Sequence, residues 1–286
     1  MASLKELRQR IRSLQNTHKL TAAMKLVASS KLKSSQKKLS VSIPFANRID
    51  HLFFNLIHTV DTNEPLFQQK RLSKIRLCVI SADRGLCGNF NHQLTKFSLE
   101  KIKEFQQQNI ELEIISIGKK GYDALQRALP KMEIDFAGAV SQESLELAST
   151  ISQNLITDLR KKRIDGFFII HNSFQSILSH PPVMKQLFPP LIPKEVSPHL
   201  CHSIIEPSIK EVLQVIIPKR ILSQIQLSLL ESITGENGAR MAAMDNASRN
   251  SADLIAHLTI EANGLRQAMI TTELIEIISG SEALKG

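Results

Sequence analysis

One short turn in this sequence has residue types that could do chemistry. The run Asp83-Arg84-Gly85-Leu86-Cys87-Gly88 follows an apolar stretch and precedes a helical pattern. Two glycines before a helix can admit an anion to its free backbone N–H groups. A tight strand-to-helix turn explains them equally well, and we favour it because neither GxGxxG nor GxxxxGK[ST] occurs. Cys87 could act as a nucleophile, but no His or Asn partner can be placed beside it from the sequence.

The rest of the chain offers little catalytic chemistry. HExxH and GxSxG are both absent. Cys78, Cys87 and Cys201 form no CxxC pair, which favours reduced thiols over a disulfide or a zinc site. Trp is absent and there is 1 Tyr, so aromatic platforms for single-stranded nucleic acid are scarce. We expect no catalytic residue, no cofactor and no metal.

The elements that must position any functional residue are long helices at both ends. Apolar residues recur at alternating spacings of three and four over about 4–39 and 209–284. Such stripes are buried only against each other or against a partner. Leu4, Leu7, Ile11 and Leu14 begin a heptad that His18 and Thr21 continue. A second track of Leu20, Met24 and Val27 then takes over in the manner of a stutter.

The positive charge is concentrated on the first of these helices. Residues 1–40 hold ten Lys or Arg against Glu6 alone, a net charge equal to the +9 of the whole 286-residue chain. Residues 209–286 are slightly acidic and residues 41–208 are nearly neutral. The distribution predicts an acidic partner surface facing the first helix.

The C-terminal helix carries a seam and an unusual tip. Its seam contains many Ser, Ala and Thr residues, which lets a second helix approach closely. Beyond Met269 the apolar residues surround the helix on nearly all sides, so this tip must be enclosed. We expect other chains to enclose it; the alternative is that the tip folds back onto this protein's own sheet.

The middle of the chain predicts an α/β domain. Strand and helix patterns alternate, which implies a mainly parallel sheet covered by helices. Expected strands are 76–81, 111–118, 132–136, 166–171, 173–178 and 203–206. Expected helices are 91–107, 119–129 and 142–162, and Pro44 is expected to kink or break the first long helix before a further helix at 45–60. A linker is expected at 61–71, and a proline-rich loop or a stiff extended segment at 180–198.

Three stretches resemble one family, in the same order along the chain. Residues 2–6 and 16–28 (ASLKE and NTHKLTAAMKLVA) resemble the start of the gamma subunit of the F-type ATP synthase. Residues 83–88 (DRGLCG) resemble its loop after the first central strand. Residues 240–244 (RMAAM) and 266–280 (RQAMITTELIEIISG) resemble its C-terminal helix.

The resemblance implies a fold and a set of partners. The fold is α/β, a long antiparallel coiled coil of both terminal helices with a central Rossmann-like parallel-sheet domain. We expect helices at 1–60 and 208–286 and the domain at 72–207. In the family the shaft lies inside three alpha and three beta subunits, and its foot binds epsilon and the c-ring. The foot would correspond to 31–47 and 203–212.

Matching residue by residue assigns contacts to this chain. Met24 and Lys25 match positions that face the acidic lever of a beta subunit, and Arg266, Gln267 and Thr271 match positions at the beta catch loops. We also expect Arg8, Arg12 and Glu273 to bind partners. Ala22, Asn89 and Gly264 depart from the family's usual residues. Gly264 stands where a basic residue is common, so that contact is not carried over.

The predicted function is a non-catalytic rotor shaft that couples ion flow through the c-ring to ATP synthesis on the beta subunits. The alternative is a basic coiled-coil protein that binds nucleic acid or scaffolds a complex. A small-molecule enzyme using the central sheet is a third class. No run of eighteen apolar residues occurs and the N-terminus lacks the apolar core of a signal peptide. Together with these features, the resemblance implies a peripheral protein on the cytoplasmic face of a bacterial inner membrane.

Overall fold

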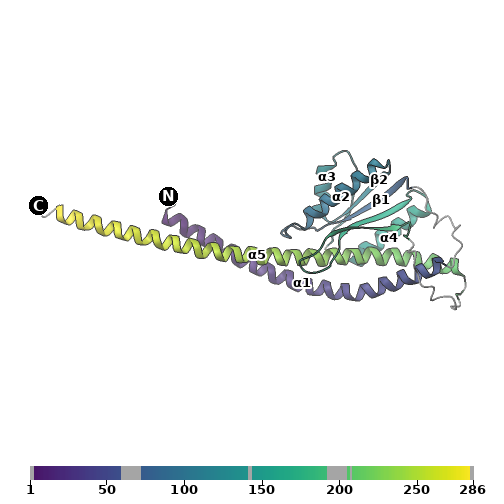
Figure 1. Cartoon of the computed structure of the whole chain (residues 1–286), viewed down its shortest axis with the longest axis horizontal. Helices are drawn as coiled ribbons and strands as arrows, with labels where there is room; N and C mark the ends of the chain where they lie inside the picture. The colour runs from purple at the N-terminus through teal and green to yellow at the C-terminus, as the bar shows by residue number, and fades with distance from the viewer. Residues whose placement is uncertain (1–2, 59–71, 141–143, 192–204, 207, 284–286) are drawn as a thin grey trace. The chain divides into compact units, whose positions relative to one another are not determined.

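The computed structural model describes residues 3–58, 72–140, 144–191, 205–206 and 208–283 (Figure 1). The chain forms two compact units. The helix-pair unit contains Met1–Ala28 and Met241–Gly286, and the domain unit contains Ser29–Arg240. Helices α1 (Leu4–His58) and α5 (Ile209–Ala283) run through both units.

The domain unit is built on a 5-stranded sheet in the order β3-β2-β1-β4-β5. Neighbouring strands are parallel except β4 and β5, which are antiparallel. The strands are β1 (Lys74–Ile80), β2 (Glu111–Ile117), β3 (Ile134–Gly138), β4 (Gly166–Asn172) and β5 (Pro182–Phe188). The helices between them are α2 (Phe90–Gln107), α3 (Lys119–Ala128) and α4 (Ser144–Arg160). This confirms the predicted α/β class.

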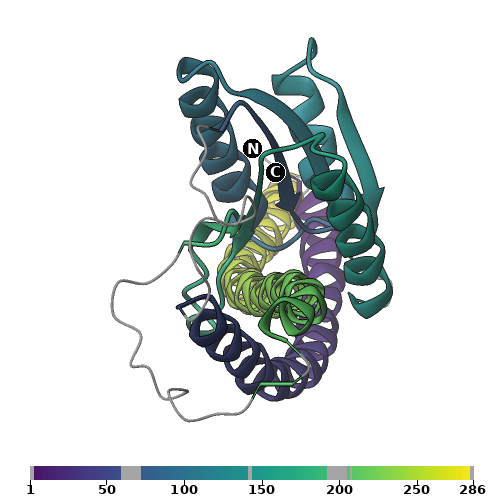
Figure 2. The ribbon, with the colours of Figure 1, turned by 90° about the vertical axis from the view of Figure 1, so that its right-hand side faces the viewer.

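Alternation along β1 divides the core between the two faces of the sheet. Leu77 and Val79 belong to a cluster formed with α2 and α3, while Cys78 and Ile80 belong to a cluster formed with α4 and α5. Side chains of successive strand residues point to opposite faces, so one apolar strand serves both clusters. In Figures 1 and 2 the green start of α5 lies between the sheet and the dark blue end of α1.

The fifth strand corrects the sequence prediction. Residues 173–178 contain no strand, and β5 lies instead inside the segment that was expected to be a proline-rich loop or a stiff extended segment. Proline is compatible with the first residue of an edge strand, where Pro182 stands, because its missing N–H costs little there. The proposed strand at 203–206 and the linker at 61–71 lie largely or wholly outside the described residues.

Of the kink or break that was expected at Pro44, the break does not occur. The helix is continuous from Leu4 to His58. Pro44 and Ser40, whose carbonyl loses its N–H partner, both lie on the exposed face. Leu39 and Ala46 on the other face pack into one cluster with α5, so tertiary packing holds the helix on both sides of the proline.

In the helix-pair unit α1 and α5 pack antiparallel. Leu7 packs with Leu258 and Ala262, whereas further along α1 Lys25 reaches back to Asp245. Leu4, Ile11, Leu14 and Leu265 extend the same apolar cluster. The predicted pairing of the two terminal helices is confirmed.

The expected stutter in the seam of α1 is wrong. Thr21, Ala28 and Leu32 are buried, so the heptad that starts at Leu4 continues without a shift. Leu20 and Val27, which the second track would have buried, are 60% and 57% exposed. Two rows of residues run side by side on this part of α1. The row that forms the seam contains smaller residues, so it was harder to recognise in the sequence.

Candidate partner-binding surface

The last described turns of α5 expose a continuous apolar surface. Its large apolar side chains are 49–68% exposed; they are Met269, Ile270, Leu274, Ile275, Ile277 and Ile278. At about 100° per residue these positions cover about two thirds of the helix circumference. Leu4, at the start of α1, packs in the cluster that contains Leu265 of α5. The pairing of the two helices therefore ends before it reaches the tip of α5. A surface of this kind marks an interaction site.

Polar residues that we expect to bind partners lie on the same part of α5. Arg266, Gln267, Thr271 and Glu273 are all exposed. The Thr271 hydroxyl donates to the Gln267 carbonyl one turn earlier, so its own donor is satisfied within the helix. Among the described residues neither Arg266 nor Glu273 forms an ion pair. Their charges remain available to a partner.

The start of α1 presents basic side chains beside this tip. Lys5, Arg8 and Arg12 line a groove of about 570 Å³ that also touches Met269. The spacing of three and four places these cations on one face of the helix. Glu6, the one nearby carboxylate on α1, accepts from the Ser3 backbone N–H at 2.9 Å and thereby completes a capping box with the Ser3 hydroxyl.

Met24 and Lys25 lie in a different setting. Both are partly buried, and the Lys25 Nζ lies 2.7 Å from the Asp245 Oδ1, while the Asp245 Oδ2 pairs with Arg249. Asp245 is a partner that the sequence analysis missed; its position opposite Lys25 follows only from the antiparallel register. The hydrogen bond from Lys25 lowers the pKa of Asp245. Lys25 is therefore engaged within the chain and not a free cation.

The turn between β1 and α2 does not present a nucleophile. Cys87 is buried, and burial raises the pKa of its thiol. Leu86 and Gly88 have positive φ angles of 62° and 58°, which accounts for a glycine at the second position. Arg240 donates to the carbonyl oxygens of Arg84 and Gly85 at 3.4 and 3.2 Å. The tight-turn interpretation fits this geometry.

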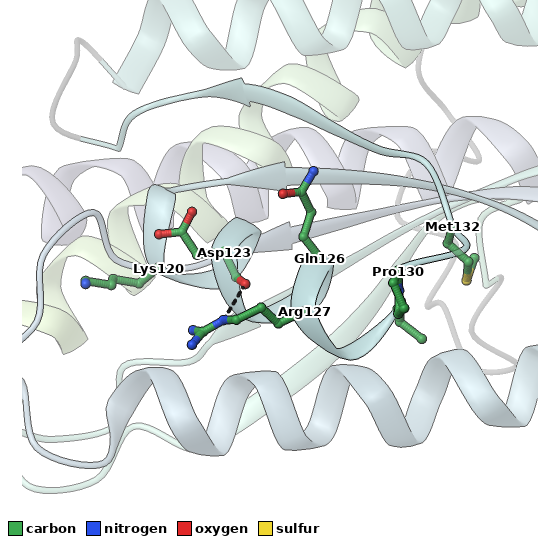
Figure 3. A pocket seen from close by; sticks show the side chains of 7 residues that line it. Lys120, Asp123, Gln126, Arg127, Pro130 and Met132 are labelled. Carbon is green, nitrogen blue, oxygen red and sulfur yellow. Dashed lines mark hydrogen bonds between the residues drawn. The ribbon is translucent and has the colours of Figure 1, made fainter.

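A hollow of about 720 Å³ lies on the domain surface along α3 (Figure 3). Its polar lining comes from Lys120, Asp123, Gln126 and Arg127. Arg127 Nε donates to the Asp123 backbone carbonyl one turn earlier and not to the Asp123 carboxylate. No described nucleophile with an adjacent base lines this hollow, so it has no catalytic arrangement.

Two further searches of the described ranges bear on function. No three His, Cys, Asp or Glu side chains gather there as a metal site would need. No described helix combines the length and the apolar character that crossing a bilayer requires.

Comparisons with known proteins identify the family of this chain. A family profile described as ATP synthase matches residues 3–284. ATP synthase gamma chains of Trichlorobacter lovleyi and Geotalea daltonii are 38% and 39% identical to this chain, with all of both chains covered. A gamma chain of Rhodobacter capsulatus is 38% identical over 99% of this chain and all of its own.

Solved structures share the fold. A chain from the Euglena gracilis mitochondrial ATP synthase (OSCP/F1/c-ring) matches with a TM-score of 0.65 and 14% identity, covering 98% of this chain and 94% of that one. A chain from the central stalk and c-ring of the Tetrahymena thermophila enzyme gives 0.59 and 23%, covering 80% and 99%. Nothing in these comparisons supports a nucleic-acid-binding or scaffold protein. This chain belongs to the gamma-chain family of ATP synthase.

Proposed function

We propose that this chain is the central rotor shaft of an ATP synthase, with its helix-pair unit held by the alpha and beta subunits. The observation that carries the proposal is the tip of α5, where apolar side chains cover about two thirds of the helix circumference and stay exposed. A rotating part needs a contact that does not depend on its angle. An apolar collar supplies one, because hydrophobic contact is non-directional.

The chain is not itself an enzyme; it is a subunit of a rotary complex whose catalytic sites lie on the beta subunits. A single asymmetric shaft cannot contact three equivalent subunits identically. Each contact therefore biases one subunit toward a different conformation, and rotation exchanges the biases. Inverting a 1:99 population requires about 5.5 kcal/mol of differential contact energy.

The directional contacts are assigned to charged and polar side chains. Arg266, Gln267, Thr271 and Glu273 would meet the catch loops of the beta subunits. Arg8, Arg12, Met24 and Lys25 would face acidic levers. The support is their exposure, or partial exposure for the last two, together with the basic charge of α1.

Leu20, Leu26 and Val27 extend this surface on α1. They are more than half exposed although they are large and apolar. They lie next to Met24 on the outer side of a seam that is already filled by Thr21 and Ala28. We assign them to apolar contacts with the same levers, because the pair of helices leaves them uncovered.

The remaining partners follow from the family. Epsilon and the c-ring would bind the foot, which includes α1 at 31–47, where Val41 and Phe45 are exposed. The F1 portion of the enzyme is membrane-associated, and we place this chain on the cytoplasmic face of a bacterial inner membrane as a peripheral subunit. The coupling ion is proposed to be the proton.

Native co-purification tests the proposal. A tagged full-length chain, expressed in its own host, should recover alpha and beta subunits in a fixed ratio of three each at low and high salt. Recovery of nucleic acid that disappears at high salt would instead support the basic-scaffold alternative, because phosphate contacts weaken steeply with salt. Turnover of a small molecule by the purified chain alone would support the third class.

A further inference from the structure

The crevice in which folds of this class usually bind a ligand is occupied here by the chain itself. In an open doubly wound sheet that crevice lies at the carboxyl ends of two adjacent strands whose connections run in opposite directions. In this sheet these strands are β1 and β4. Ala239 of α5 packs there in one buried cluster with Ala82, Cys87 and Phe90, and all four belong to the domain unit.

Two glycines on α5 receive specific groups from the domain. A Cβ on Gly235 would lie 3.2 Å from Cε2 of Phe90 and 3.3 Å from Cβ of His180. A Cβ on Gly238 would lie 3.1 Å from the backbone carbonyl oxygen of Ile177. One glycine therefore accepts the edge of an aromatic ring, and the other accepts a main-chain carbonyl.

A partly buried polar contact lies on the same face of α5. Glu231 Oε2 is 2.5 Å from Nε2 of His171 on β4 and 3.3 Å from Nζ of Lys185 on β5. Residues 231, 235 and 238 are separated by four and three positions, so they share one face of the helix. Hydrophobic contact alone would let a helix turn or slide in its groove. Two fitted glycines and one charged hydrogen bond allow a single rotational setting.

We infer that Gly235 and Gly238 are positioning residues that fix the rotational setting of α5 in the domain, so that the domain and α5 turn as one body. We call the contacts of Glu231, Gly235 and Gly238 the α5 seat. The inference rests on the proposed rotor function. Torque applied to α5 is transmitted only if the helix cannot turn inside the domain, and α5 is continuous from Ile209 to Ala283.

Matched glycine substitutions in the assembled complex test the seat. The variants are Gly238→Val and Gly235→Val, with Gly264→Val as the control, because a Cβ on Gly264 meets nothing within 4 Å. All three glycines lie inside α5, so a valine at any of them changes the helix propensity to a similar extent. Inverted membrane vesicles report ATP hydrolysis and ATP-driven proton uptake, and hydrogen exchange of the purified full-length chain reports whether residues 81–89 have loosened.

The two seat variants should hydrolyse ATP yet lose most of the proton uptake per ATP, while Gly264→Val should match the unsubstituted chain. Should a valine variant not assemble, Gly235→Ala and Gly238→Ala provide smaller intrusions that should lower the uptake per ATP in part. Normal coupling together with faster exchange at 81–89 in either variant would overturn the inference. Failure of the unsubstituted chain to join the complex would instead overturn the rotor function.

Discussion

Lys25 on α1 and Asp245 on α5 form an ion pair of 2.7 Å across the helix-pair unit. Their side chains are 44% and 25% exposed, so water screens the attraction. Lys25 is also a proposed contact for a beta lever, and the two roles make different predictions. If the pair only stabilises the chain, removal of either residue should have the same effect. If Lys25 also contacts a beta subunit, removal of Lys25 should have the larger effect.

A double-mutant cycle on Lys25→Ala and Asp245→Ala separates these roles. In unfolding of the full-length chain the interaction energy should not exceed about 1 kcal/mol, as for other exposed pairs. In ATP-driven proton uptake Lys25→Ala should cause the larger loss. Equal losses from both single variants would assign the pair a purely structural role.

Met24→Lys should impair coupling while the complex still assembles. Met24 is partly buried and adjoins the exposed Leu26 and Val27, so a lysine there places a second cation next to an apolar contact surface. A charge at such an edge must be desolvated or must find a new partner. The measurement is proton uptake at matched ATP hydrolysis. Normal pumping would count against a lever contact at this position.

The sequence predicted most elements of the fold because their periodicity is strong. A helical period of three to four residues is clear in the seam from Leu4 to Leu14 and along α5. Continuous runs of apolar, β-branched residues are clear in strands β1, β2 and β4. Elements set by tertiary contact were missed. Pro44 is tolerated because Leu39 and Ala46 pack on α5, and Pro182 because it begins an edge strand; neither fact is local.

The candidate surface was predictable in part for the same reason. The apolar tip is visible in the sequence because no period of a single stripe fits it. The exposure of Leu20 and Val27 could not be predicted in this way. The seam contains Thr21 and Ala28, which are less apolar than the neighbouring row of Leu20 and Val27. Asp245 and the α5 seat depend on contacts between residues that lie far apart in the chain, from 46 positions for Lys185 and Glu231 to 220 for Lys25 and Asp245. A single sequence does not encode such contacts locally.

Acid should destabilise the domain unit through His171. This side chain is fully buried, and burial lowers its pKa below the ordinary 6.5. As the pH falls through 6.5 the unfolded chain binds a proton that the folded chain does not, so the free energy of unfolding decreases. His180, whose pKa is also lowered by burial, acts in the same range.

Urea unfolding of the full-length chain at pH 7.5 and 5.5 measures this effect. His171→Asn should reduce the difference in unfolding free energy between the two pH values, even if it weakens the protein at both. The same substitution at the exposed His257 serves as the control. Glu231 does not confuse the result, because its pKa is lowered from 4.5 and its contribution is lost only below that pH. An unchanged difference in His171→Asn would contradict the assignment.

Removal of one partner of the buried ion pair between the two long helices should lower the unfolding free energy more than replacement of both partners. Arg220 is 7% exposed, pairs with Asp50 at 2.7 Å and stacks over Phe53. Asp50→Ala leaves its guanidinium buried without a counter-charge and should destabilise the chain by about 3 kcal/mol. Asp50→Ala with Arg220→Met should recover much of that loss in urea unfolding. A double variant weaker than Asp50→Ala would show that the pair itself supplies the stability.

The tip of α5 should contribute to assembly and not to the stability of the free chain. Ile277 is 68% exposed, so Ile277→Asp should change the unfolding free energy by no more than about 0.5 kcal/mol. Ile225→Ala, at a fully buried position, should cost about 2–5 kcal/mol by the same assay. In the complex Ile277→Asp should have the larger effect of the two on assembly. It should lower the amount of alpha and beta subunits recovered with the chain, because a carboxylate must then be desolvated inside the collar. Undiminished recovery with Ile277→Asp would mean that the exposed tip is not the held surface.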